Sequence, residues 1–374
     1  MTSQVTTPRR DGSSGIRRGE GVAGWLFTAP IIVILGVFLF IPVLMALWVS
    51  FSDWTGRGSP LSGNVGFVGL QNYAAVTTDG GLPTRNFGLS LRNNAWYVLL
   101  VVPLQTILAL FLAVLVSRAI LRGRGLFRTA FYFPSVTSSV AITVLWLFLF
   151  STTGVINEVL SWVGINGPNW FNDPRGIVHI AAGAVGLGAG PEALTSGGFL
   201  GITWWEWLAG PSVAMFAFIL MAIFTTSGTM MLLFIAALQN VGVELGEAGM
   251  MDGATGWQRF WHITLPQLRP TLFTVLTLGL IGCWQVFEQI YTGTQGGPSK
   301  TTLTPAYLSY QAAFQGQEWG EGSAIAFILF VIIIVFTIFQ RWVLRDRPVS
   351  KRRIRQYQVK GQAPAPIPVK GAKP

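Results

Sequence analysis

The sequence predicts an all-α, polytopic membrane protein with about six transmembrane helices. Of its 374 residues, 51% are hydrophobic and only 11% are charged, which is more apolar surface than a water-soluble core of this size can hide. Several apolar runs reach about 20 residues, the length that a helix needs to cross roughly 30 Å of hydrocarbon. Helices are favoured over a β-barrel because a helix pairs every backbone amide within the segment, whereas barrel strands would be shorter and alternating.

The predicted spans are six apolar runs, at residues 24–50, 95–117, 128–150, 212–238, 270–292 and 322–344. They define a transmembrane domain over residues 24–345, between a basic amino-terminal tail (1–23) and a basic, Pro-containing tail (346–374). The first run follows four arginines and superficially resembles a signal peptide. It is too long for the apolar region of a signal peptide and contains Pro30 and Pro42, so we interpret it as a retained helix.

Lys and Arg residues are distributed unevenly between the loops. Twenty of the 25 lie before the first run, between Arg118 and Arg128, at Arg259 and Arg269, and from Arg341 to Lys373. Because Lys and Arg collect on the cytoplasmic side, both termini are predicted to be cytoplasmic, in a multi-pass protein of the cell (inner) membrane. The same distribution accounts for the net charge of +10, so binding of nucleic acid is not predicted.

The segment at residues 177–210 is apolar and Gly-rich but is interrupted by a proline and two glutamates. One additional crossing there would invert the charge bias of every later loop. We therefore predict an extracytoplasmic insertion, with Trp204, Trp205 and Trp207 at the lipid interface. A re-entrant hairpin is the alternative.

The loop between the fourth and fifth runs (239–269) carries the most regular pattern. Leu245, Ala248 and Met251 recur at helical spacing, two glutamates lie near the helix start, where the dipole favours acids, and Gly253 permits a sharp turn. A short amphipathic helix of this kind suits docking into a groove of a soluble partner. A helix lying on lipid would instead carry a polar face rich in Lys and Arg.

This loop resembles the EAA loop of ABC importer permeases, whose pattern is Glu-Ala-Ala, three residues, Gly, nine residues and Ile-x-Leu-Pro. Gly249 replaces the second alanine of the pattern, which lowers helix propensity by about 1 kcal/mol. The residues predicted to couple the chain to an ATPase are Glu247, Ala248, Gly249, Asp252, Gly253, Ile263, Leu265 and Pro266.

Three further segments, 67–73, 127–134 and 296–298, resemble those of maltose-type and glycerol-phosphate-type permeases. The resemblance implies import of a sugar or sugar-like solute by a heterodimer with a second homologous permease, two copies of a cytoplasmic ABC ATPase and an extracytoplasmic solute-binding protein. It also implies that the chain is a transport subunit without enzymatic activity, with ATP and Mg²⁺ bound by the ATPase. The sequence has no Gly-x-x-x-x-Gly-Lys-Ser/Thr loop of its own.

The fifth run carries the candidates for the substrate path. Trp284, Glu288 and Tyr291 follow i, i+4, i+7 spacing, with Gln285 beside them. Aromatic faces next to hydrogen-bonding groups suit a sugar. Glu288 is the only acid within the predicted spans, and ionisable groups at membrane depth are usually functional. A role in gating, or plain hydrogen bonding between helices, is the alternative for these residues.

No metal site or bound cofactor is predicted. One cysteine, Cys283, and two histidines, His179 and His262, are too few and too far apart to form a ligand set. An ion-coupled secondary transporter would be expected to carry several buried ionisable groups, and a membrane-embedded enzyme would need clustered acids or histidines. A permease of the same kind for a non-carbohydrate solute is the third alternative.

Overall fold

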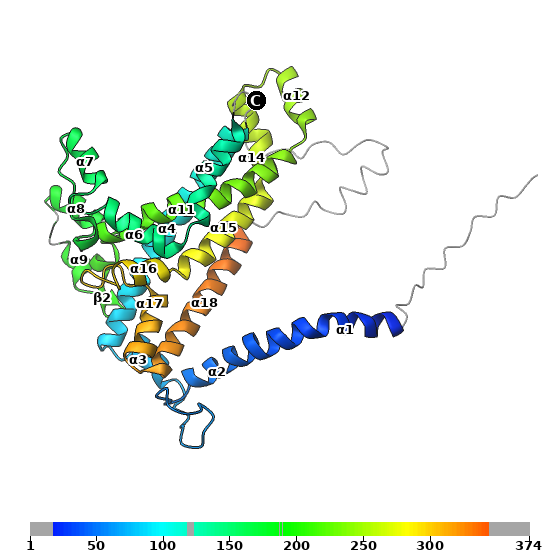
Figure 1. Cartoon of the computed structure of the whole chain (residues 1–374). Helices are drawn as coiled ribbons and strands as arrows, with labels where there is room; N and C mark the ends of the chain where they lie inside the picture. Colours follow the sequence, from blue (N-terminus) through cyan, green and yellow to red (C-terminus); the bar gives the residue numbers. More distant parts are fainter. Residues whose placement is uncertain (1–17, 118–122, 187, 189, 344–374) are drawn as a thin grey trace, which may run out of the picture.

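A computed structural model of the chain describes residues 18–117, 123–186, 188 and 190–343 (Figure 1). The predicted amino-terminal tail up to residue 17 and the tail at 346–374 lie outside the described residues. Among these described residues, five helices are long and apolar enough to cross a membrane, and the number is six if a bent helix pair is counted as one span. The all-α membrane fold predicted from the sequence is confirmed.

The five long spans lie close to their predicted positions, at Ala23–Ser50, Leu82–Ser117, Val213–Gln239, Arg269–Gly293 and Trp319–Val343. The first consists of α1 (Arg18–Leu35), the π-helical turn η1 (Gly36–Phe40) and α2 (Ile41–Ser50). The π turn directly precedes Pro42, which has no amide hydrogen to donate to the preceding turn. The other spans are α4 (Leu82–Ser117), α11 (Val213–Gln239), α15 (Arg269–Trp284) with α16 (Glu288–Gly293), and α18 (Trp319–Val343).

The predicted single span at 128–150 is wrong as a continuous helix. The segment forms α5 (Arg124–Val136) and α6 (Ser139–Leu149), bent by 98°. Pro134 cannot donate a helical hydrogen bond. The hydroxyls of Ser135 and Thr137 donate to carbonyls three and four residues back, bonds that often bend a helix. Thr137 then adopts an extended conformation, with ψ of 144°, and the helix ends there.

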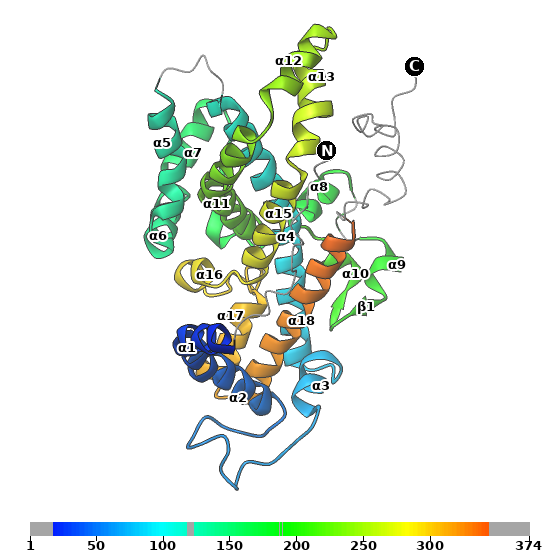
Figure 2. The same cartoon turned by 90° about the vertical axis from the view of Figure 1, so that its right-hand side faces the viewer.

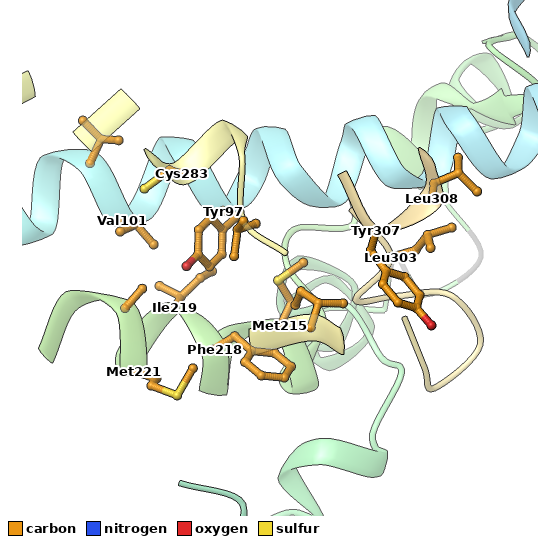
Figure 3. Packing of buried hydrophobic residues seen from close by; sticks show 14 of the residues in the cluster. Tyr97, Val101, Met215, Phe218, Ile219, Met221, Cys283, Leu303, Tyr307 and Leu308 are labelled. Atoms are coloured by element: carbon orange, nitrogen blue, oxygen red, sulfur yellow. The ribbon is translucent and has the colours of Figure 1, made fainter. Parts of the chain in front are cut away.

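The centre of the bundle lies between α4 and α11. Figure 3 shows Tyr97 and Val101 of α4 near Ile219 of α11, with Cys283 of α15 beside them. Because lipid tails are as apolar as these side chains, close packing has to hold the helices together in the bilayer. At Gly228 of α11 an added Cβ would lie 2.3 Å from the carbonyl oxygen of Phe131, so only glycine permits this approach to α5.

The first helix leaves the bundle as an arm. Figures 1 and 2 show α1 projecting away from the other membrane helices, while α2 returns to the side of α18. Nearly all side chains from Ala23 to Leu44 are exposed on the single chain. Apolar side chains in water would be unfavourable, so this surface requires lipid or another protein.

The predicted insertion at 177–210 folds into short elements, and none of them in its described part is long enough to cross a membrane. These are α8 (Ile177–Ala184), α9 (Glu192–Thr195), β1 (Gly198–Phe199), antiparallel β2 (Ile202–Thr203) and α10 (Trp204–Trp207). They lie at the opposite end of the molecule from α12 (Val243–Met251) (Figure 1).

The three tryptophans of α10 do not share one interface. Trp204 is exposed, Trp205 stacks on the ring of His179 at 4.6 Å, and Trp207 packs against the central apolar cluster. The expectation that all three rest on lipid is therefore wrong. Trp207 fastens the insertion to the bundle, whereas Trp205 packs within the insertion. An ion pair of 2.9 Å between Glu206 and Arg85 of α4 adds to the attachment.

The remaining short elements lie near the ends of the spans. They are α3 (Gln71–Thr77), α7 (Val155–Trp162), the 3₁₀ turn η2 (Trp170–Asn172), α17 (Pro305–Tyr310) and the π turn η4 (Gln311–Gln315).

Candidate functional site

The predicted coupling loop forms a compact helical segment at one end of the molecule. It comprises α12, α13 (Gly256–Arg259), the π turn η3 (Phe260–Thr264) and α14 (Leu265–Gln267), and it projects beyond the ends of α4 and α11 (Figures 1 and 2). Gly253 has φ of +77°, a conformation that glycine adopts without strain and that reverses the chain after α12. Thr255 and Gln258 then form a reciprocal capping box that begins α13.

The two ends of the predicted motif meet across this turn. An added Cβ at Gly249 would lie 2.9 Å from Cδ1 of Ile263 and 3.4 Å from Cγ of Arg259, so the glycine allows α12 to lie directly on η3. The Arg259 guanidinium donates to the carbonyl of Gly246 at 3.4 Å. Glycine in place of the second alanine of the pattern therefore allows close packing of α12 on η3, which helix propensity alone does not reveal.

The opposite face of α12 is exposed and mixes apolar and acidic side chains. Met251 is 89% exposed, and Leu245 and Met250 are also exposed. Glu247, Ala248 and Asp252 lie on the exposed surface as well. Leu265 and Pro266 lie half-buried at the base of the segment. Of the eight predicted coupling residues, three are exposed on or next to α12, Gly253 makes the turn, Gly249 and Ile263 meet where α12 lies on η3, and the last two lie at the base of the segment.

The predicted stripe along the fifth span does not exist as one face. The helix stops at Trp284 and resumes at Glu288, because residues 285–287 leave the helical conformation. Trp284 is 2% exposed and packs in a separate cluster with Leu329 and Ile333 of α18. Gln285, Glu288 and Tyr291 are exposed, so the structure separates Trp284 from the other three candidates.

Buried polar side chains from other elements satisfy the backbone at this break. Asn94 of α4 donates to the carbonyl of Trp284 at 3.1 Å, and Thr304 donates to the carbonyl of Val286 at 3.0 Å. Asn94 and Thr304 are both fully buried. A broken helix at membrane depth is tolerated where its freed backbone groups find such partners, so the break is a built feature of the fold.

Comparison with known proteins assigns the family. Residues 105–347, more than half of the chain, match the model for binding-protein-dependent transport system inner membrane components. The chain belongs to this family. The matched region contains the bent helix pair, the coupling segment and the break in the fifth span.

Curated relatives of this permease are similar over most of their length. A lactose transport system permease protein of Rhizobium radiobacter is 31% identical over 89% of this chain and 98% of its own. A trehalose/maltose transport system permease protein of Thermococcus litoralis is 29% identical over 90% and 98%, and an arabinooligosaccharides transport system permease protein of Bacillus subtilis is 29% identical over 84% and 86%.

The same fold occurs in a solved structure. A chain of a bacterial ABC transporter involved in the import of the acidic polysaccharide alginate superposes with a TM-score of 0.65, at 21% identity, over 87% of this chain and 97% of its own. This likeness concerns the fold, and the family match makes the chain an inner membrane component of a binding-protein-dependent transport system.

The sequence did not single out a polar node between three spans of this permease. Gln105 of α4 is fully buried and accepts a short hydrogen bond from the hydroxyl of Thr226 of α11. Gly279 of α15 faces the same amide, since a Cβ there would lie 2.2 Å from Nε2 of Gln105. The presence of a glutamine inside an apolar run was the sequence signal that could have indicated this node. In the described part of the chain, no group of three or more His, Cys, Asp or Glu side chains could hold a metal ion.

Proposed function

We propose that this permease imports a carbohydrate that an extracytoplasmic binding protein delivers, and that α12 couples the transport path to a cytoplasmic ABC ATPase. Two copies of the ATPase would serve this chain and a second, homologous permease, each permease forming half of the path. ATP and Mg²⁺ would bind to the ATPase, so this chain supplies the lever and not the hydrolysis.

The exposed face of α12 is the observation that carries the coupling proposal. Met251 projects almost completely into solvent, beside the carboxylate of Glu247, while Gly249 holds the back of the helix against Ile263. A helix that is held from behind and carries an exposed apolar ridge suits insertion into a groove of another protein. A lipid-facing helix would be expected to carry Lys and Arg on its polar side.

The carbohydrate assignment is supported by the solutes for which the relatives are named. These are lactose, trehalose/maltose and arabinooligosaccharides, which are all carbohydrates although their sugars differ. A permease of the same kind for another solute is the outcome that would contradict this assignment.

The arrangement in the membrane follows from the charges and from the arm. Lys and Arg concentrate in the tails and in the loops that follow the second and fourth predicted spans, which supports the proposal that both termini lie in the cytoplasm. Fusions of a periplasmic and a cytoplasmic reporter to the carboxyl terminus test this orientation. The exposed apolar surface of α1 supports contact with the second permease, because the arm leaves its own bundle.

Co-purification with the ATPase tests the coupling proposal. Burial of a methionine side chain is worth about 1.5–3 kcal/mol, so Met251→Ala is expected to weaken ATPase association about tenfold to hundredfold. Glu247→Arg is expected to weaken it too, by reversing the charge of the docking face. Glu192→Arg and Leu61→Ala are matched controls, since both residues are exposed. They lie in α9 and between α2 and α3, elements at the opposite end of the molecule from α12 (Figure 1). Equal association of all four variants would refute the docking role of α12.

Transport in proteoliposomes tests the rest. The complete importer with its binding protein is expected to accumulate a labelled sugar only when ATP is present on the side of the membrane where the ATPase lies. Uptake that persists on a proton or sodium gradient after ATP depletion would instead identify a secondary transporter.

A further inference from the structure

Six aromatic side chains touch one another in a row, from the break in the fifth span to the end of the bundle opposite α12. We call them the aromatic track: Tyr291, Phe287, Tyr310, Phe314, Trp319 and Trp54. Successive ring centroids lie 5.5, 5.3, 5.1, 4.7 and 5.2 Å apart. The track passes from α16 over α17 and η4 to the start of α18, which lie one below another in Figure 2.

Helix packing does not account for the whole track. Tyr307 of α17 is 1% exposed and fills the space behind the rings, so it fastens α17 to the bundle. In contrast, Phe314 is 61% exposed and Tyr291 is 42% exposed. Two rings that leave most of one face open contribute little to the packing of α17 on α18.

The inner end of the track does not face lipid. Glu288 and Gln285 are exposed on the same short stretch of chain as Tyr291. A carboxylate is costly in hydrocarbon, and such groups face a water-filled cavity or another protein. Gln315 directly follows Phe314 in η4, so an amide that can form hydrogen bonds also lies beside the middle of the track.

The outer end of the track is held in a fixed position. The indole of Trp319 lies against the backbone of Gly56, where an added Cβ would lie 2.0 Å from Nε1. Ser309 of α17 donates to the carbonyl of Gly322 of α18 at 2.7 Å, and Thr304 anchors the start of α17 to the break. The rings are therefore presented by rigid elements and need little ordering before they bind a ligand.

We infer that the aromatic track is a binding path for a chain of sugar units, along one wall of the translocation path. A pyranose ring has apolar C–H faces that stack on aromatic rings and a rim of hydroxyls that the neighbouring amide and carboxylate groups can bind. Consecutive rings engage consecutive sugar units, so the track favours an oligosaccharide over a single sugar. This inference rests on the proposed function and adds the class of carbohydrate.

Transport of a length series tests the inference. The complete importer, with its binding protein, is reconstituted and supplied with labelled malto-, arabino- and galacto-oligosaccharides of one to six units. Loss of one stacked ring in Phe314→Leu or Tyr291→Leu is expected to raise KM about threefold to tenfold for the longest sugar imported and less than twofold for the shortest. Tyr291→Phe, which retains the ring, is expected to remain near wild type.

The control is Phe330→Leu, which removes an exposed ring of α18 outside the track and is expected to leave KM unchanged at every length. A KM that is equal to wild type, or that rises equally for all lengths, overturns the inference. Loss of assembly with the second permease in Phe314→Leu also overturns it, because the ring would then belong to the subunit interface. If the wild-type importer takes up none of these sugars, the proposed function itself fails.

Discussion

The break between α15 and α16 gives the sharpest test of how the fifth span is held. Thr304 is fully buried and its hydroxyl donates to the carbonyl of Val286 at 3.0 Å. Thr304→Val retains the shape and removes the donor. Hydrogen bonds between membrane helices are worth about 0.6 kcal/mol on average, whereas a buried carbonyl left without a donor costs about 1–3 kcal/mol. The cost of the unpaired carbonyl applies here because Val286 lies next to a helix end, where its carbonyl has no donor from the helix. We therefore expect the free energy of unfolding to fall by about 1–2 kcal/mol.

Thermal unfolding of the purified permease in detergent measures this loss, and a fall in Tm of about 2–6 °C is expected. Amide exchange at residues 285–288 is expected to accelerate in the same variant, since the local structure loses its anchor. Thr274→Val is the matched control on α15, because the exposed Thr274 hydroxyl donates only to a carbonyl of its own helix. If the two variants lose the same stability, Thr304 does not cap the break.

Three further predictions concern glycines and one ion pair. Gly228→Ala is expected to cost about 1–3 kcal/mol by forcing α11 from the α5 backbone, whereas Gly36→Ala, with open space around it, is expected to leave Tm unchanged or higher. Gly249→Ala is expected to change ATPase association less than threefold, because about 1 kcal/mol of helix propensity offsets a rotamer shift of Ile263 that costs about 0.5–1.5 kcal/mol. Hydrogen bonds from Arg175 lower the pKa of Asp173. The pair therefore stabilises the segment before α8 at pH values above the usual Asp pKa, and this stabilisation is lost as pH falls through the lowered pKa. Arg175→Gln is expected to raise the Asp173 pKa, which carboxyl NMR titration measures.

The sequence predicted the long spans because their signal is local. A run such as 213–239 is long, mostly apolar and free of charged residues, and no partner is needed to recognise it as a membrane helix. The coupling loop was found for a similar reason, since Glu247, Gly253 and Pro266 lie at fixed separations within one segment. What the sequence could not give was the contact between Gly249 and Ile263, which depends on how the turn closes.

The errors arose where distant residues decide the backbone. Helical spacing placed Trp284 and Tyr291 on one face, on the assumption that the helix continues between them. The hydrogen-bond donors that stabilise the break, Asn94 and Thr304, are far away in the sequence. Nothing in the sequence near residues 285–287 indicates that these donors are present. The bend at Thr137 had a visible local cause in Pro134, but proline is tolerated in many membrane helices, so its presence alone did not predict a turn of 98°.

The position of α15 links the two parts of the candidate site. Its first turn follows α14 directly, and its last residue, Trp284, precedes the break. Sixteen residues of uninterrupted helix span about 24 Å at 1.5 Å per residue, and the side chain of Gln340 ties this rod to α18 through Phe273 and Thr277. A displacement of α12 by an ATPase would therefore reach residues 285–288 through one stiff element. Because α15 already ends at Trp284, the chain can change direction at residues 285–288 without breaking a helical hydrogen bond. Glu288 and the inner end of the aromatic track lie at this same place.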